Sequence, residues 1–420
     1  MRNLALSTMT LLCGAMLFAQ NNTITAVQVG VGDIINVNQK GIFNDANVVQ
    51  NGNFNLADVE QCGEGNFAKL EQTGNLNISW LTQLGDYNFS CVVQDGDENF
   101  SDVDQTGDNN YNDGFQLGDL NDSDVDQFGD ANFSLFRQFG NKNRSLTNQN
   151  GDDNTAEVYQ NFRRNTSTLN QFGDNNYTLS IQDGRLNTSD VSQDGDDNTA
   201  EVNQFFRRNT SILSQTGNNN GAFTFQDGKL NASNTIQFGD NNTAEVIQLF
   251  RKNTAFIYQA GDGNDAITFQ DGKLNKSDTY QIGISNFHYV EQNGNRNENT
   301  NIQFGNFNYN FISQQGNRNE SFVLQFGDYN KNTTLQVGNR NESDVYQFGD
   351  FNCSEISQDG NKNKAFIYQL GNNHIAEIIQ TGNLNEASIT QGLFSPGPFN
   401  TTITQTGNQN LVKIDQNGSF

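Results

Sequence analysis

The chain of 420 residues is poor in the residues that build a conventional core or a chemical site. It has two prolines, one tryptophan and four cysteines, and only 34% of its residues are hydrophobic. Cys62, Cys91 and Cys353 fall at unrelated positions, so neither a disulfide framework nor a cysteine metal site is predicted. Because no large apolar core is available, something other than bulk burial must order the chain.

Positive charge is also scarce. The 23 Lys and Arg residues are outnumbered by 48 Asp and Glu, and the formal net charge of −25 argues against nucleic-acid binding as a main role. The only histidines, His288 and His374, have no matching cysteine or serine nucleophile, so no enzyme activity, catalytic residue or cofactor is predicted. No segment beyond residue 19 is apolar enough to cross a bilayer, so no membrane span is expected.

The first 19 residues have the composition of a secretory signal peptide. Arg2 supplies the positive start, residues 4–18 form an apolar stretch too short to span a membrane, and Ala19 offers a small residue for cleavage. The mature chain is therefore expected to begin near Gln20 and to be extracellular or at the cell surface.

A repeat of 11 residues fills most of the remaining sequence. Glutamine recurs every 11 residues from Gln28 to Gln391 without a break, glycine almost always follows two residues later, and asparagine follows five residues later. Such regularity is unlike a disordered linker, although disorder of the free monomer before assembly stays open. The unit reads Q-x-G-x-x-N-x-(A/S)-x-(V/I/L)-x.

The repeat predicts strands rather than a helical coiled coil. One Gly and one Asn in every 11 residues would penalise a helix repeatedly. From Asn154 to Gln160 the sequence alternates with a period of two: small, apolar or amide side chains point one way and Thr155, Glu157 and Tyr159 point the other. The four residues between Gln and Asn have the chemistry of a tight turn.

Two kinds of turn, or arch, alternate, which doubles the period to 22 residues. We therefore predict an all-β fold: a β-solenoid with two strands and two arches per 22-residue rung, about 17 rungs, and cross-β stacking at a spacing of roughly 4.8 Å. The solenoid should occupy residues 20–391. A proline-containing insertion at 392–404 and a terminal repeat at 405–420 complete the chain.

Inward-pointing amides are the candidate functional residues of this solenoid. Stacked Gln and Asn side chains should form amide ladders, each bonded to its copy in the neighbouring rung. Representative ladder residues are Gln149, Asn154, Gln160, Asn165, Gln303, Asn308, Gln325, Asn330, Gln347 and Asn352.

Gln149, Gly151, Asn154, Ala156 and Gln160 carry a unit that resembles the curlin repeat of secreted curli fibre subunits. The resemblance implies a structural subunit of an extracellular functional amyloid, exported through a dedicated outer-membrane pore and assembled with itself and related curlin subunits. Its role would be in biofilm matrix and surface adhesion. A non-polymerising β-solenoid adhesin, or a fibre nucleator at the cell surface, is the alternative.

Charge is sorted by arch type. Most Lys and Arg residues of the mature chain lie on or beside one alternating set of arches, and we expect a basic edge that attracts anions. Side-by-side packing of fibres is the favoured use, with acidic matrix polysaccharide as another partner. The candidates are Arg163, Arg164, Arg207, Arg208, Arg251 and Lys252.

Two further functions were weighed. Acidic arches such as residues 194–197 suggest calcium, but their spacing matches neither an EF-hand loop nor a calcium-binding nonapeptide repeat, and turn chemistry explains them equally well. An ice-binding surface would need a flat array of Thr-x-Thr, which does not appear. Phe304, Phe326 and Phe348 recur every 22 residues and should stack.

Overall fold

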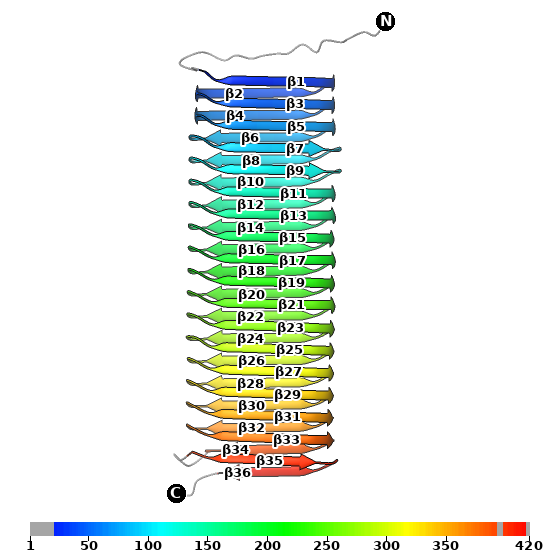
Figure 1. Cartoon of the computed structure of the whole chain (residues 1–420), viewed down its shortest axis with the longest axis vertical. Coiled ribbons are helices and arrows are strands. Elements are labelled where there is room, and N and C mark those ends of the chain that lie inside the picture. Colours follow the sequence, from blue (N-terminus) through cyan, green and yellow to red (C-terminus); the bar gives the residue numbers. More distant parts are fainter. Residues whose placement is uncertain (1–20, 393–397, 417–420) are drawn as a thin grey trace. The chain divides into compact units, whose positions relative to one another are not determined.

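The computed structural model describes residues 21–392 and 398–416, and every regular element in them is a β-strand (Figure 1). The chain divides into two compact units, Met1–Asp197 and Asn198–Phe420. In each unit, odd-numbered strands form one parallel sheet and even-numbered strands form the other. Residues 1–20, which include the predicted signal peptide, lie outside the described part.

The first unit contains sixteen described strands. Its odd strands are β1 (Thr23–Val31), β3 (Asp45–Asn53), β5 (Phe67–Asn75), β7 (Phe89–Asp95), β9 (Tyr111–Leu117), β11 (Phe133–Asn141), β13 (Thr155–Arg163) and β15 (Tyr177–Arg185). Its even strands are β2 (Ile34–Ile42), β4 (Leu56–Glu64), β6 (Ile78–Leu84), β8 (Phe100–Thr106), β10 (Asp122–Phe128), β12 (Arg144–Asn150), β14 (Thr166–Phe172) and β16 (Thr188–Asp194).

The second unit contains twenty described strands. Its odd strands are β17 (Thr199–Arg207), β19 (Gly221–Lys229), β21 (Thr243–Arg251), β23 (Asp265–Lys273), β25 (Phe287–Asn295), β27 (Tyr309–Asn317), β29 (Lys331–Asn339), β31 (Cys353–Asn361), β33 (Ile375–Asn383) and β35 (Asn400–Thr406). Its even strands are β18 (Thr210–Thr216), β20 (Ala232–Phe238), β22 (Thr254–Ala260), β24 (Lys276–Ile282), β26 (Glu298–Phe304), β28 (Glu320–Phe326), β30 (Glu342–Phe348), β32 (Lys364–Leu370), β34 (Glu386–Gln391) and β36 (Leu411–Gln416).

Parallel pairing joins each residue to the one 22 positions later, as Gln28 pairs with Gln50 and Gln303 with Gln325. One odd strand, its arch, one even strand and its arch therefore make one rung. The predicted all-β solenoid with two strands per 22-residue rung is confirmed. It has about 18 turns rather than about 17, because the strands after the proline-containing insertion also stack. Arches after odd strands are called odd arches below, and those after even strands are called even arches.

The interior is thin and half polar. In β13 the residues Ala156, Val158 and Gln160 are fully buried, and the residues between them are only partly buried. The largest buried side chain is Phe136, which lies in the same inward column as Gly114 of the preceding rung. A Cβ atom on Gly114 would lie 2.0 Å from Cζ of the Phe136 ring, so the missing side chain of one rung makes room for the large one of the next.

The proline-containing step changes the register locally. Ile375 of β33 pairs with Asn400 of β35, 25 positions later, and Gln380 still reaches Gln405 across the step. Residues 400–404, which were expected within the insertion, thus begin the last odd strand. Three extra residues are accommodated outside the two sheets, and the stacking of ladder glutamines continues beyond them.

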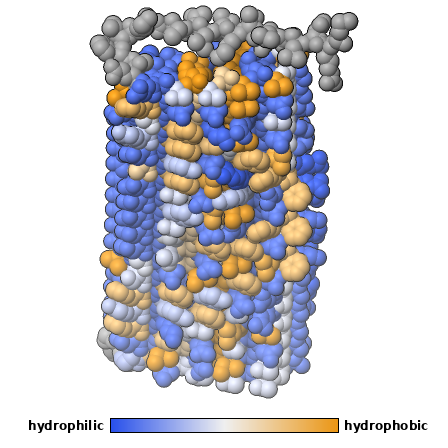
Figure 2. Space-filling model, turned by 45° about the horizontal axis from the view of Figure 1, so that its top comes forward, coloured by the Kyte–Doolittle hydropathy of each residue, from blue (hydrophilic) through white to orange (hydrophobic). Residues whose placement is uncertain are grey.

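Outward-facing side chains gather in columns of similar hydropathy along the face drawn in Figure 2. This follows from the 22-residue register, which places equivalent positions of successive rungs directly above one another within each unit. The described residues contain no helix long and apolar enough to cross a membrane.

Candidate functional site

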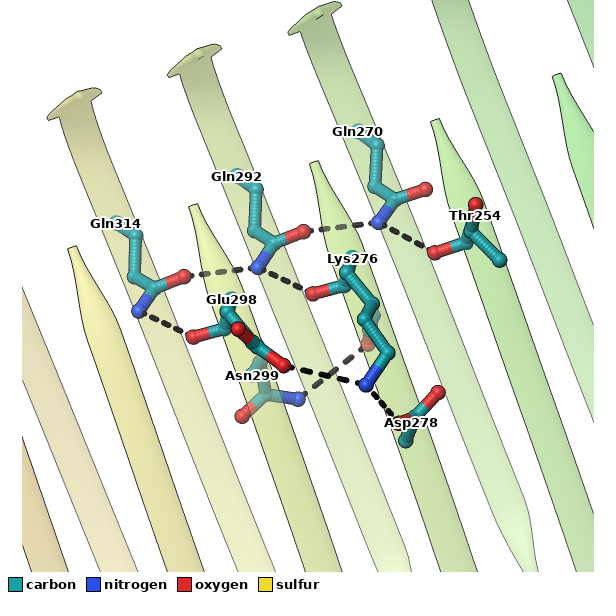
Figure 3. Close-up of polar contacts among 9 residues, drawn as sticks. Thr254, Gln270, Lys276, Asp278, Gln292, Glu298, Asn299 and Gln314 are labelled. Atoms are coloured by element: carbon teal, nitrogen blue, oxygen red, sulfur yellow. Dashed lines mark hydrogen bonds and ion pairs between the residues drawn. The ribbon is translucent and has the colours of Figure 1, made fainter. Parts of the chain in front are cut away.

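The ladder glutamines bond in two directions (Figure 3). Gln270 Nε2 donates to Oε1 of Gln292 at 2.9 Å, and Gln292 Nε2 donates to Gln314 at 2.8 Å. The same nitrogens also donate to backbone carbonyls of the opposite sheet, Gln270 to Thr254 at 3.0 Å and Gln292 to Lys276 at 2.9 Å. Each glutamine therefore ties successive rungs together and also ties the two sheets to each other.

The glutamines predicted from the sequence lie in these ladders. Gln149 belongs to the even sheet and Gln160 to the odd sheet of the first unit, and both are fully buried. Gln303, Gln325 and Gln347 follow one another in the even sheet of the second unit. Their bonds to the next glutamine of the ladder measure 2.9 Å from Gln149, 2.8 Å from Gln160, 2.8 Å from Gln303, 2.8 Å from Gln325 and 2.9 Å from Gln347.

The asparagines bond differently from the expected side-chain ladder. The backbone N–H of Asn308 donates to Oδ1 of Asn286 at 3.0 Å, whereas its Nδ2 donates to the carbonyl of the arch residue Gly327 at 2.8 Å. Because asparagine is one methylene shorter and starts its strand, its amide reaches the backbone of the adjacent arch. The other predicted asparagines, Asn154, Asn165, Asn330 and Asn352, make the same pair of bonds.

His374 replaces asparagine in this column and reproduces its bonding. Its backbone N–H donates to Oδ1 of Asn352 at 3.0 Å, and its Nε2 lies 3.1 Å from the carbonyl of Leu370. Its Nδ1 accepts the backbone N–H of Phe399 at 3.1 Å, and the two rings stack. Since Phe399 directly precedes β35, the imidazole anchors the chain where it returns from the insertion.

The predicted basic edge is exposed. Arg163 and Arg164 lie on an odd arch of the first unit, and Arg207, Arg208, Arg251 and Lys252 lie on odd arches of the second. None of these six side chains forms an ion pair with another described residue. In the second unit the edge borders an open groove lined by Arg251, Lys273, Arg296, Arg318, Arg340 and Lys362.

The acidic arches have a structural use. On the even arches of the first unit, Oδ1 of each aspartate accepts the backbone N–H of the preceding arch, as Asp108 does for Asp86 at 2.8 Å and Asp130 for Asp108 at 2.7 Å. These contacts explain the acidic arches by the turn chemistry that the sequence suggested as an alternative to calcium.

Carboxylates also crowd the outer face of the first unit. Asp102 and Asp104 of β8 lie beside Asp124 and Asp126 of β10. Partial burial, and then the neighbouring carboxylates, raise the pKa of Asp102 and of Asp126 to about 6. These two groups are therefore partly protonated in mildly acidic solution, because each charged form is disfavoured by lost hydration and by like charge.

A buried imidazole responds to pH in the opposite sense. His288 of β25 is fully buried in the inward column between Ala266 and Asn310. Burial lowers its pKa to about 3 from 6.5. Its folded-state pKa is depressed, so the unfolded chain takes up the proton first, and His288 reduces stability as the pH falls below 6.5.

We expect the replacements Asp102→Asn and Asp126→Asn together to stabilise the protein near pH 7. Their folded-state pKa is raised above the ordinary 3.8, so the folded wild type gains stability as the pH falls from about 6 to about 4. The variant should lose this gain, and its advantage should vanish near pH 4. Urea unfolding at both pH values measures the difference, with Asp190→Asn at an exposed position of β16 as the control. An unchanged advantage across this range would contradict the assignment.

The even sheet of the second unit carries an apolar column on its outer face. Phe304, Phe326 and Phe348 stack with ring centroids 6.1 and 6.4 Å apart, and Phe326 is 56% exposed. The position after the ladder glutamine is apolar in seven successive rungs: Phe238, Ala260, Ile282, Phe304, Phe326, Phe348 and Leu370. This column offers apolar area for contact with another surface.

The fold and the two amide systems define a structural class: a parallel two-sheet β-solenoid whose rungs are joined by glutamine ladders. The family model described as the curlin associated repeat matches residues 44–74, 96–129, 151–179, 163–195, 181–205, 195–228, 239–272 and 360–392. Together these segments cover half of the chain. The chain belongs to the curlin-repeat family, which confirms the resemblance seen in its sequence. No curated protein matches it.

Proposed function

We propose that this protein is a secreted structural subunit of a curli-like amyloid fibre that self-assembles by strand stacking, in biofilm matrix and surface adhesion. The observation that carries the proposal is that every rung offers the next one the same groups in the same places. Backbone pairs run in exact 22-residue register, and each ladder glutamine donates forward to its copy. A further chain could continue this pattern with no new kind of contact.

Ladder groups at both ends of the described stack support this proposal. At the start of the even sheet, the buried Oε1 of Gln39 has no partner among the described residues, although it is placed to accept from a preceding glutamine. At the other end, Glu386 N–H donates to the carbonyl of Asn410 at 2.8 Å, so the equivalent N–H of Leu411 points toward the position of the next rung. Such strand edges are templates for another chain.

Family membership supports the remaining parts of the proposal. A curlin-repeat protein is expected to be extracellular or at the cell surface, with itself and related curlin subunits as partners and with export through a dedicated pore. We assign it no cofactor and no active site. Residues 1–19 would direct secretion, and the proposal requires that they be removed before assembly.

Purified chain without residues 1–19 is expected to form thioflavin-positive fibres with a reflection at about 4.7 to 4.8 Å along the fibre axis. The double variant Leu411→Pro, Lys413→Pro should abolish growth, because every junction uses this edge, alternate N–H groups of a strand point to the same side, and proline has none. Leu411→Ala with Lys413→Ala is the matched control. A folded wild type that stays monomeric would refute the proposal in favour of a non-polymerising adhesin.

A further inference from the structure

Cations line one edge of the second unit without a gap over eight consecutive odd arches, from the β17–β18 arch to the β31–β32 arch. This basic column consists of Arg207, Arg208, Lys229, Arg251, Lys252, Lys273, Arg296, Arg318, Arg340 and Lys362. All ten side chains are exposed, and none pairs with a carboxylate of the described residues. Stacked like charges about 4.8 Å apart repel, so the column favours an anionic partner.

Carboxylates line the other kind of arch in the first unit. This acidic column consists of Asp86, Asp108, Asp130, Asp152 and Asp174, on five consecutive even arches that contain no Lys or Arg. Each aspartate except Asp86 also holds the preceding arch through Oδ1, so the carboxylates are fixed in a row. None of the five forms an ion pair with a described residue.

The two columns match each other in period. Both advance by one 22-residue rung per charge, because both are built on parallel strands paired with the same register. Opposite charges would therefore stay in step over at least five rungs, which an anionic partner with an unrelated repeat would not do. Single exposed ion pairs are weak, so a regular array is needed for a useful contact.

We propose that the basic column of one copy docks along the acidic column of a second copy and packs neighbouring fibres side by side. The inference rests on the proposed fibre function and names the surface that would join fibres laterally. The contact is heterologous, since each copy contributes its acidic column to one neighbour and its basic column to another. Such contacts do not close, so they produce bundles of indefinite width rather than dimers.

Neutralising either column should reduce bundling while single fibres still grow. The basic variant carries Arg318→Gln, Arg340→Gln and Lys362→Gln, and the acidic variant carries Asp108→Asn, Asp130→Asn and Asp152→Asn. Asparagine already fills this arch position at Asn306 and Asn372, where it accepts the same backbone bond, so the acidic variant should fold normally. Light scattering and fibre width by electron microscopy report bundling, and thioflavin fluorescence reports growth.

At about 0.01 M salt we expect each variant to bundle at least about fivefold less than wild type, and wild type at about 1 M salt to resemble the variants, since the Debye length falls from roughly 30 to 3 Å. Mixing preformed fibres of the two variants should restore contacts, because each retains the column that the other lacks. Lys40→Gln, Lys69→Gln and Lys331→Gln remove equal charge elsewhere and should leave bundling intact.

The outcomes separate this inference from its alternatives. Loss of bundling in the basic variant alone, without rescue on mixing, would overturn it in favour of a separate polyanion, such as acidic polysaccharide or nucleic acid, added to the samples in turn. Bundling that ignores salt and both variants would also overturn it. If wild-type chains form no fibres, the proposed function fails, whereas the same scattering measurement on folded chains still decides the lateral contact.

Discussion

Replacing Gln303, Gln325 and Gln347 with leucine together is expected to lower the free energy of unfolding by about 5 kcal/mol and to slow fibre growth strongly. The change removes four ladder bonds, from Gln281 through to Gln369, each 2.8 to 2.9 Å long. It also removes the bonds of 3.0 to 3.1 Å to three backbone carbonyls of the odd sheet.

The expected size follows from the groups left behind. The carbonyls of Phe287, Tyr309 and Lys331 each lose a donor, and the ladder ends at Gln281 and Gln369 each lose one partner. Each unsatisfied buried group costs about 1 kcal/mol or more, and the leucine side chains recover part of that by burial. Urea unfolding and thioflavin kinetics measure the two effects.

The control for this experiment is Gln315→Leu. Gln315 is exposed on the outer face of β27 and stacks beneath Val337 of the next rung, so an apolar residue is already accepted in its column. It should leave the unfolding free energy nearly unchanged. Equal stability of the triple variant and this control would show that the buried amides add nothing beyond filling space.

Most of the fold could be predicted from the sequence, because a repeat converts one local inference into many. The alternation around Val158 indicates the buried face of one strand, and the 22-residue period then places every other strand in register. What escaped prediction are the exceptions between rungs. Gly114 and Phe136 lie 22 residues apart in the inward column, which signals a small residue beside a large one, but the repeat pattern treats each as a deviation.

The candidate site was predicted in composition but less well in its bonding. The positions of the amides follow from periodicity, whereas the choice of partner depends on side-chain length and on the arch backbone, as at Asn308 and Gly327. The raised pKa of Asp102 depends on burial and on neighbours in the adjacent rung, which appear only when strands are stacked. His374 was recognised as standing in an asparagine position, but its bond to Phe399 arises from the insertion.

Alanine in place of Gly327 is expected to destabilise the second unit by about 2 kcal/mol, a typical cost for a backbone forced into a sparsely populated region. Gly327 has φ of 120°, and a Cβ atom there would lie 2.2 Å from the carbonyl oxygen of Gly349 in the next rung. The arch would have to shift toward the form seen at Phe162, where φ is 73°. Each arch stacks on the next, so the shift would strain its neighbours as well.

Gly221→Ala provides the matched control for this substitution, because the two glycines differ in backbone and in space. Gly221 begins β19 in ordinary extended conformation, and its nearest neighbour to a new Cβ is Thr243 Cγ2 at 3.9 Å. Alanine there should be neutral or stabilising by about 0.5 kcal/mol, since it restricts the unfolded chain without strain. Comparing the urea midpoints of both variants tests whether arch geometry, rather than glycine content, limits stability. Equal midpoints would show that the arches tolerate a side chain and that the recurring glycine has another cause.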